Sequence, residues 1–167
     1  VSGATMSTNK DNSIYEQATK IKSDLIIVQG TDDDWTNDIN IGTDKTDTKT
    51  FYGAFYSAIT KIKSNNPNSK IIVMTPTKQC YIKDGKTVRK DTTKNDLGHT
   101  LADYVDVQID ACNELDIPVY DAYHSTQFKP NIPSYRKSSM PDGVHPNEKG
   151  HEVIMYELIK NFYGFYG

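Results

Sequence analysis

The sequence predicts an α/β domain in which helices cover both faces of a parallel sheet. Three short aliphatic runs, at 24–30, 70–76 and 117–121, have the length and composition of buried strands. Amphipathic stretches precede, separate and follow these runs, so helices and strands alternate along the chain. Such alternation is typical of parallel sheets, because a helix usually makes the crossover between parallel strands.

Each of the expected helices has one apolar face. They cover 14–22, 51–63, about 97–115 and about 146–162. The first strand has four consecutive aliphatic residues, Leu25 to Val28, and is therefore expected to be buried on both faces. Three polar stretches, at 31–50, 77–94 and 124–140, are expected to be loops.

Length and charge restrict the classes of protein to which this chain can belong. With 167 residues it is expected to form a single domain, 1–167. The 19 basic and 22 acidic side chains are mixed along the chain, so no nucleic-acid partner is expected. No apolar run is long enough for a membrane span. The polar composition, with 11 tyrosines, favours an extracellular or cell-envelope protein that meets carbohydrate.

A candidate catalytic pair lies near the end of the chain, at Asp142 and His145. Gly143 allows a tight turn, and Pro146 suits the first position of a helix, so both side chains can point the same way. An aspartate in this position can orient a histidine that acts as a general base. The alternative is that Asp142 only stabilises the turn and His145 only precedes the helix.

The predicted topology brings this pair to other polar segments. The carboxyl ends of parallel strands meet at one edge of a sheet, and ligand sites form beyond that edge. Residues 30–33 follow the first expected strand, Pro76 ends the second, and the loop after the third leads to Asp142. The functional interpretation of the pair is favoured for this reason.

Three blocks of the sequence resemble those of the SGNH (GDSL-type) hydrolases, in the same order and over essentially the whole chain. Gly-Thr-Asp-Asp at 30–33 follows an aliphatic strand, and Asp-Gly-Val-His-Pro at 142–146 precedes the last helix. Ser-Gly-Ala-Thr at 2–5 is similar to the family's glycine block. The Asp-x-x-His-Pro block is the most specific of the three.

The resemblance implies a three-layer, flavodoxin-like fold and hydrolysis of esters without a metal or an organic cofactor. His145 would be the general base and Asp142 its orienting partner. Gly3 would donate a backbone N–H to the oxyanion hole, and Asp32 would occupy the position of its side-chain donor. The substrate would be a small-molecule or carbohydrate ester, with acetyl as the favoured acyl group.

Two departures from the family pattern accompany this resemblance. No Gly-Asp-Ser occurs anywhere, although the family's nucleophilic serine lies in that block, before the glycine block. The hypothesis is that N-terminal strands, a helix and the serine are missing from this chain and belong to a longer protein or a separate N-terminal fragment. Asp32 stands where the family normally has Asn. An ionised carboxylate cannot donate to an oxyanion, whereas an aspartate kept protonated by burial could. Loss of one such donor costs about 3 kcal/mol of transition-state stabilisation.

Other interpretations of individual residues stay open. Cys80 lies on the same sheet edge and could pair with His145 as a nucleophile, whereas Cys112 has the spacing of a core residue. The acidic run 32–34 together with Asp38 could bind calcium but lacks the pattern of a known loop. Trp35 could line a substrate pocket or anchor its loop.

The competing functional class is a non-catalytic binding module for carbohydrate or a surface that retains the fold. The missing serine and the aspartate at position 32 favour this class, and the Asp142 and His145 pair opposes it.

Overall fold

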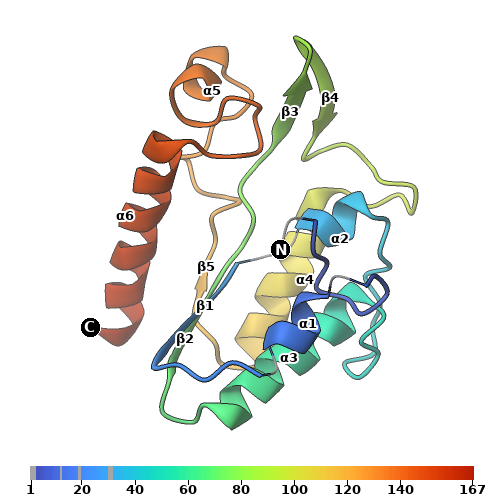
Figure 1. The fold of residues 1–167 in the computed structure, drawn as a ribbon, viewed down its shortest axis with the longest axis vertical. Helices are drawn as coiled ribbons and strands as arrows, with labels where there is room; N and C mark the ends of the chain where they lie inside the picture. The colour runs from blue at the N-terminus through green and yellow to red at the C-terminus, as the bar shows by residue number, and fades with distance from the viewer. Residues whose placement is uncertain (1–2, 12, 19, 30–31) are drawn as a thin grey trace.

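A parallel sheet with helices on both faces forms the centre of the molecule (Figure 1). The computed structural model describes residues 3–11, 13–18, 20–29 and 32–167. Its three parallel strands are β1 (Leu25–Gln29), β2 (Lys70–Met74) and β5 (Val119–Tyr120), in the order β1-β2-β5. The predicted fold class is confirmed.

Two helical layers enclose the sheet. On one side lie α1 (Ile14–Ala18), α3 (Phe51–Asn65) and α4 (Leu101–Glu114), and on the other lie α5 (Pro133–Ser139) and α6 (Glu148–Tyr166) (Figure 1). Side chains of β2 alternate between these layers because successive residues of a strand point to opposite faces. Ile71 and Val73 join the core beneath α3 and α4, whereas Ile72 and Met74 join the core beneath α6.

Strand β1 differs from its prediction, since only one of its faces is buried. Ile26 and Val28 are buried in the core on the α3 side, but Leu25 is 44% exposed and Ile27 is 49% exposed. The strand lies at the edge of the sheet, and α6 packs against β2 and β5 without covering these two side chains. The run of four aliphatic residues predicted burial on both faces, but among the described residues one of these faces is open.

Three predicted loops contain short regular elements. Residues 31–50 include α2 (Asp32–Thr36), 77–94 form the hairpin of β3 (Cys80–Lys83) and β4 (Lys86–Lys90), and 124–140 include α5. The hairpin has a recognisable signal, because Asp84-Gly85 between its strands has positive φ angles of 50° and 73°. Its strands are mostly exposed, so they lack the apolar pattern that identifies core strands.

Two helix starts also differ from prediction. Helix α4 begins at Leu101, because the Asn95 side chain accepts hydrogen bonds from the backbone N–H groups of Leu97 and His99 and holds 95–99 in a turn. Helix α6 begins at Glu148, with Asn147 as its N-cap, so Pro146 precedes the cap. No helix among the described residues is long and apolar enough to cross a membrane.

Candidate active site

The Asp142 carboxylate closes a turn and holds the His145 ring at the same time. Its Oδ1 accepts from the backbone N–H groups of Val144 (2.9 Å) and His145 (2.7 Å), and its Oδ2 lies 2.6 Å from Nδ1 of His145. Partial burial alone would raise the pKa of Asp142, but the hydrogen bonds from His145 and Val144 outweigh burial and hold that pKa below its usual value. An ionised Asp142 keeps the proton on Nδ1 and leaves Nε2 as the basic nitrogen.

The hairpin fixes the position of this loop. The backbone N–H of Cys80 donates to the Gly143 carbonyl (2.9 Å), and that of Ile82 donates to the Asp142 carbonyl (2.8 Å). Gly143 has a φ of 79°, and a Cβ at this position would lie 1.8 Å from the Cys80 carbonyl oxygen. Glycine is required here both by the backbone conformation and by the close approach of β3.

A buried aspartate joins the first residues of the chain to α2. Asp34 is fully buried, and its carboxylate accepts from the backbone N–H groups of Met6 (2.6 Å) and Ser7 (3.1 Å). These bonds hold the segment that contains Gly3 beside the helix that contains Asp32. The buried Asp34 is therefore a structural link within the acidic run.

These segments surround a cavity of about 430 Å³ at the carboxyl edge of the sheet. Three of the predicted site residues, Gly3, Asp32 and His145, line it together. The other lining residues are Gln29, Asp33, Pro76, Thr77, Gln79, Val144, Pro146 and Ile154. Ser2, Gly30 and Thr31, which complete two of the sequence blocks, lie outside the described residues.

A second cavity of about 200 Å³ adjoins the first and shares Asp32, Asp33 and His145 with it. Burial raises the pKa of Asp33, and the neighbouring Asp32 charge raises it further, while Arg89 and His145 oppose the shift. Arg89 lines this cavity, and Gln79 lines the larger one. Neither residue could be predicted as part of the site, because both lie in a stretch that the sequence indicates to be a polar loop.

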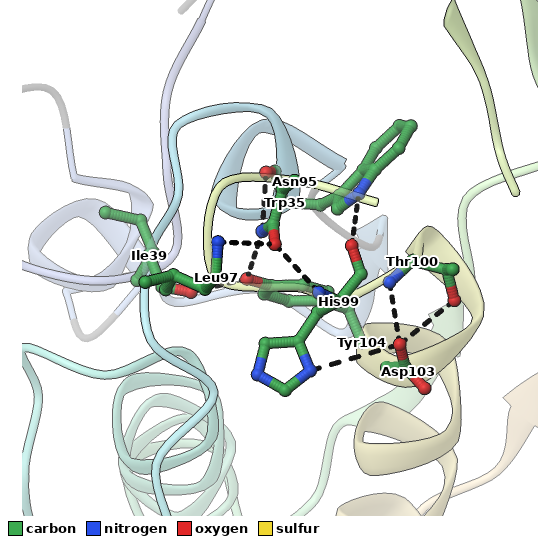
Figure 2. A network of polar contacts seen from close by, with 8 residues as sticks. All are labelled: Trp35, Ile39, Asn95, Leu97, His99, Thr100, Asp103 and Tyr104. Carbon is green, nitrogen blue, oxygen red and sulfur yellow. Dashed lines mark hydrogen bonds and ion pairs between the residues drawn. The ribbon is translucent and has the colours of Figure 1, made fainter. Parts of the chain in front are cut away.

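Trp35 anchors its loop and does not line either cavity. Its side chain is 1% exposed, and its indole N–H donates to the His99 carbonyl (3.1 Å), as Figure 2 shows. Asn95 donates to the Trp35 carbonyl (3.1 Å) and to the Tyr104 hydroxyl (3.1 Å), which connects the loop to α4 (Figure 2). Of the two interpretations of Trp35, its burial favours the loop anchor.

The remaining alternatives find little support in the geometry. Cys80 is 3% exposed and is absent from the residues that line the two cavities; its backbone, not its thiol, contacts the histidine loop. Cys112 is buried in the core, and burial raises the pKa of its thiol to about 12. Within the described ranges, no three His, Cys, Asp or Glu side chains are grouped to hold a metal ion.

A second pair with the same spacing lies after β5. The Nδ1 atom of His124 is 2.7 Å from Oδ2 of Asp121, and the His124 backbone N–H donates to Oδ1 (3.1 Å). His124 does not line the cavities that contain His145. The Asp-x-x-His spacing at 121–124 is the signal that could have found this pair.

The model of the GDSL-like lipase/acylhydrolase family matches residues 1–153. No curated protein matches the chain. One similar crystal structure has 28% sequence identity and a TM-score of 0.88, with 97% of this chain and 76% of that chain covered.

Two further solved structures share the fold. A protein from Lactobacillus plantarum is 24% identical with a TM-score of 0.83, covering 99% of this chain and 79% of that chain. A variant of an acetyl-xylooligosaccharide esterase from Geobacillus Stearmophilus is 18% identical with a TM-score of 0.56, covering 91% and 63%. A family match over most of the chain, with the Asp142 and His145 pair in place, leads to one conclusion: the chain belongs to the GDSL-like lipase/acylhydrolase family.

Proposed function

We propose that this protein is a serine esterase that removes a small acyl group, most favourably acetyl, from an alcohol. A serine Oγ attacks the ester carbonyl carbon while Nε2 of His145 takes the hydroxyl proton. The carbonyl oxygen becomes an oxyanion, which then collapses as His145 returns the proton to the departing alcohol. Water repeats these steps on the acyl-serine and releases the carboxylic acid and the free serine.

The observation that carries this proposal is the contact of 2.6 Å between Asp142 Oδ2 and His145 Nδ1 at the wall of a cavity. The aspartate stabilises the imidazolium that forms when His145 takes a proton. Gly3 lines the same cavity, which supports its proposed role as a backbone N–H donor to the oxyanion. A volume of about 430 Å³ accommodates a short acyl group together with part of the alcohol.

The nucleophile is proposed to lie outside this sequence. Gly-Asp-Ser is absent from all 167 residues, and the residues that line the cavity within the described part of the chain include no serine. Similar structures are longer, since this chain covers 76% of one and 79% of another. The exposed Leu25 and Ile27 of β1 offer an apolar face and a strand edge to a segment that carries the serine.

A carbohydrate is proposed as the alcohol. The polar, tyrosine-rich composition supports this choice, and one protein of the same fold is an acetyl-xylooligosaccharide esterase. The carboxyl and guanidinium groups of Asp33 and Arg89 line the adjoining cavity with Tyr81, and such groups hydrogen-bond sugar hydroxyls.

The two Asp–His pairs provide the test of catalysis. In the protein expressed with its complete upstream coding sequence, His145→Ala should lower kcat for an aryl acetate by about 10²–10⁴. His124→Ala removes an imidazole with the same type of partner and should leave kcat within about twofold, because it lies away from the cavity. Turnover that survives His145→Ala would rule out the mechanism.

Labelling with a fluorophosphonate identifies the nucleophile. The full-length protein should take one label on a serine outside residues 1–167, and His145→Ala should slow the labelling. A label on a residue within 1–167 would contradict the proposed position of the serine. Binding of an acetylated xylo-oligosaccharide without any turnover or label would instead favour the non-catalytic binding module.

A further inference from the structure

A side-chain amide that the family pattern does not predict lies in the wall of the cavity. Gln79 precedes β3 at the base of the hairpin, where its backbone carbonyl accepts from the N–H of Asp91 (3.0 Å). The residue is 3% exposed and lines the same cavity as Gly3 and His145. Its backbone is therefore fixed, and its side chain is largely removed from bulk water.

Two neighbouring side chains determine the orientation of the Gln79 amide. Arg89 donates from Nη2 to the Oε1 atom of Gln79 (3.3 Å), and Nε2 of Gln79 donates to Oδ2 of Asp32. Since a guanidinium can only donate, the atom that faces Arg89 must be the amide oxygen. The NH₂ group consequently lies on the side of Asp32.

One of the two N–H bonds of the Gln79 amide has no acceptor among the described residues. An NH₂ group carries two hydrogens, and Asp32 accepts one of them. No other described residue accepts from Nε2 of Gln79, although the residue is buried. A buried donor without a protein partner is costly unless water or a ligand accepts from it, and here the adjoining space is the cavity.

Arg89 contacts two aromatic rings as well as the Gln79 amide. Its guanidinium carbon lies 5.0 Å from the centre of the Trp35 ring and 5.6 Å from that of Tyr81. These cation–π contacts favour one position of the guanidinium and therefore of the amide that it contacts. Its positive charge also lowers the pKa of Asp33 at the edge of the cavity, and it withdraws electron density from the Gln79 amide.

We infer that Gln79 supplies the side-chain N–H of the oxyanion hole. This inference rests on the proposed esterase function. Asp32 accepts from Gln79, so in this arrangement the carboxylate orients the donor instead of being one. The ester carbonyl oxygen, as it becomes negative, accepts the second Nε2–H of Gln79 together with the backbone N–H of Gly3. Arg89 and Asp32 are positioning residues.

Replacement of Gln79 by Met tests the donor in the full-length protein. Methionine has nearly the length and volume of glutamine but no N–H, so kcat for an aryl acetate should fall by about 10²–10³ while KM changes little. Gln108→Met is the matched control, because Gln108 is 1% exposed on α4 and does not line the cavity. Its kcat should stay within about threefold of the wild-type value. Gln79→Glu replaces Gln79→Met if circular dichroism shows that the latter does not fold.

A second substitution separates a missing donor from damaged packing. Asp32→Asn in the Gln79→Met background places an amide at position 32 and should recover at least tenfold in kcat, whereas it cannot repair a packing defect at 79. The inference is overturned if Gln79→Met alone keeps kcat within threefold, or if Asp32→Asn recovers nothing. The esterase proposal is tested separately by loss of activity in His145→Ala. Failure of the esterase proposal would therefore appear in His145→Ala, whereas failure of the Gln79 inference would appear only in the Gln79 and Asp32 variants.

Discussion

The molecule contains two Asp-x-x-His pairs with almost the same local geometry and different surroundings. Their ring-to-carboxylate distances are 2.6 Å for His145 and 2.7 Å for His124. The two aspartates are similarly accessible, with side chains 34% exposed at Asp142 and 35% exposed at Asp121. An imidazole held by a carboxylate is therefore common to both pairs and cannot by itself distinguish a catalytic site.

The difference lies in what faces each imidazole. His145 lines a cavity with Gly3 and Gln79, so the proposed base and the proposed oxyanion donors face one space. The His124 ring instead packs edge-on against Tyr123, with ring centres 5.0 Å apart, and its partner Asp121 contacts Thr75 Oγ1 at 3.4 Å. The Asp-x-x-His spacing therefore creates the contact between ring and carboxylate, whereas neighbours from distant segments determine whether the imidazole faces a cavity.

The largest expected effect comes from changing the carboxylates of the two pairs. Asp142→Asn should lower kcat of the full-length protein by about 10²–10⁴, because the asparagine NH₂ donates to Nδ1 and moves the proton of His145 to Nε2. Asp121→Asn makes the same change at the second pair and should keep kcat within about twofold. Equal losses of kcat in both variants, measured with an aryl acetate, would contradict the functional difference between the two pairs.

An intermediate effect is expected at the glycine inside the turn that joins Asp142 to His145. Gly143→Ala combines a positive φ with a Cβ only 1.8 Å from the Cys80 carbonyl oxygen, and should lower the free energy of unfolding by roughly 3 kcal/mol. Gly98→Ala has a similar φ of 85° with open space around the Cβ, and should cost about 1 kcal/mol. Denaturant unfolding of both variants measures the difference, and similar values would mean that β3 does not constrain the turn.

The smallest effect concerns the acidic side chain beside His145. Burial and the Asp32 charge raise the pKa of Asp33 above its ordinary value, so the folded protein binds this proton more tightly than the unfolded chain does. The stabilisation of the folded protein by protonated Asp33 is complete below the pKa that Asp33 has in the unfolded chain. It is lost as the pH rises through the higher pKa that Asp33 has in the folded protein. Asp33→Asn should therefore increase thermal stability at pH 7, with little gain near pH 3. The same gain at both pH values would contradict this origin.

The fold class and the Asp142–His145 contact could be predicted from the sequence. Aliphatic runs such as Lys70–Met74 and the apolar faces of α3 and α4 predict a parallel sheet with helices on both sides, and this is the structure observed. Asp142 and His145 could be predicted together because they are three residues apart, with a glycine between them. Local elements of this kind depend on short-range periodicity and turn chemistry, which a single sequence displays.

The hairpin and its contribution to the site could not be predicted in the same way. Its strands are mostly exposed and polar, so hydrophobic periodicity gave no signal for them. The contact of Gln79 with Asp32 joins residues 47 positions apart, and the burial of Asp34 beneath Met6 and Ser7 joins residues 28 and 27 positions apart. Nothing in their local sequence indicates that these groups meet.

The three strands of the sheet, the existence of the long helices and the Asp142–His145 turn follow from the sequence, because these features depend on neighbours within a few positions. The tertiary structure alone decided that Gly3, Gln79 and His145 share one cavity and that His124 is excluded from it. It also decided that one face of β1 is open and that Trp35 is an anchor. These outcomes depend on how the sheet, the hairpin and the first residues pack together, and packing between distant segments has no local signature.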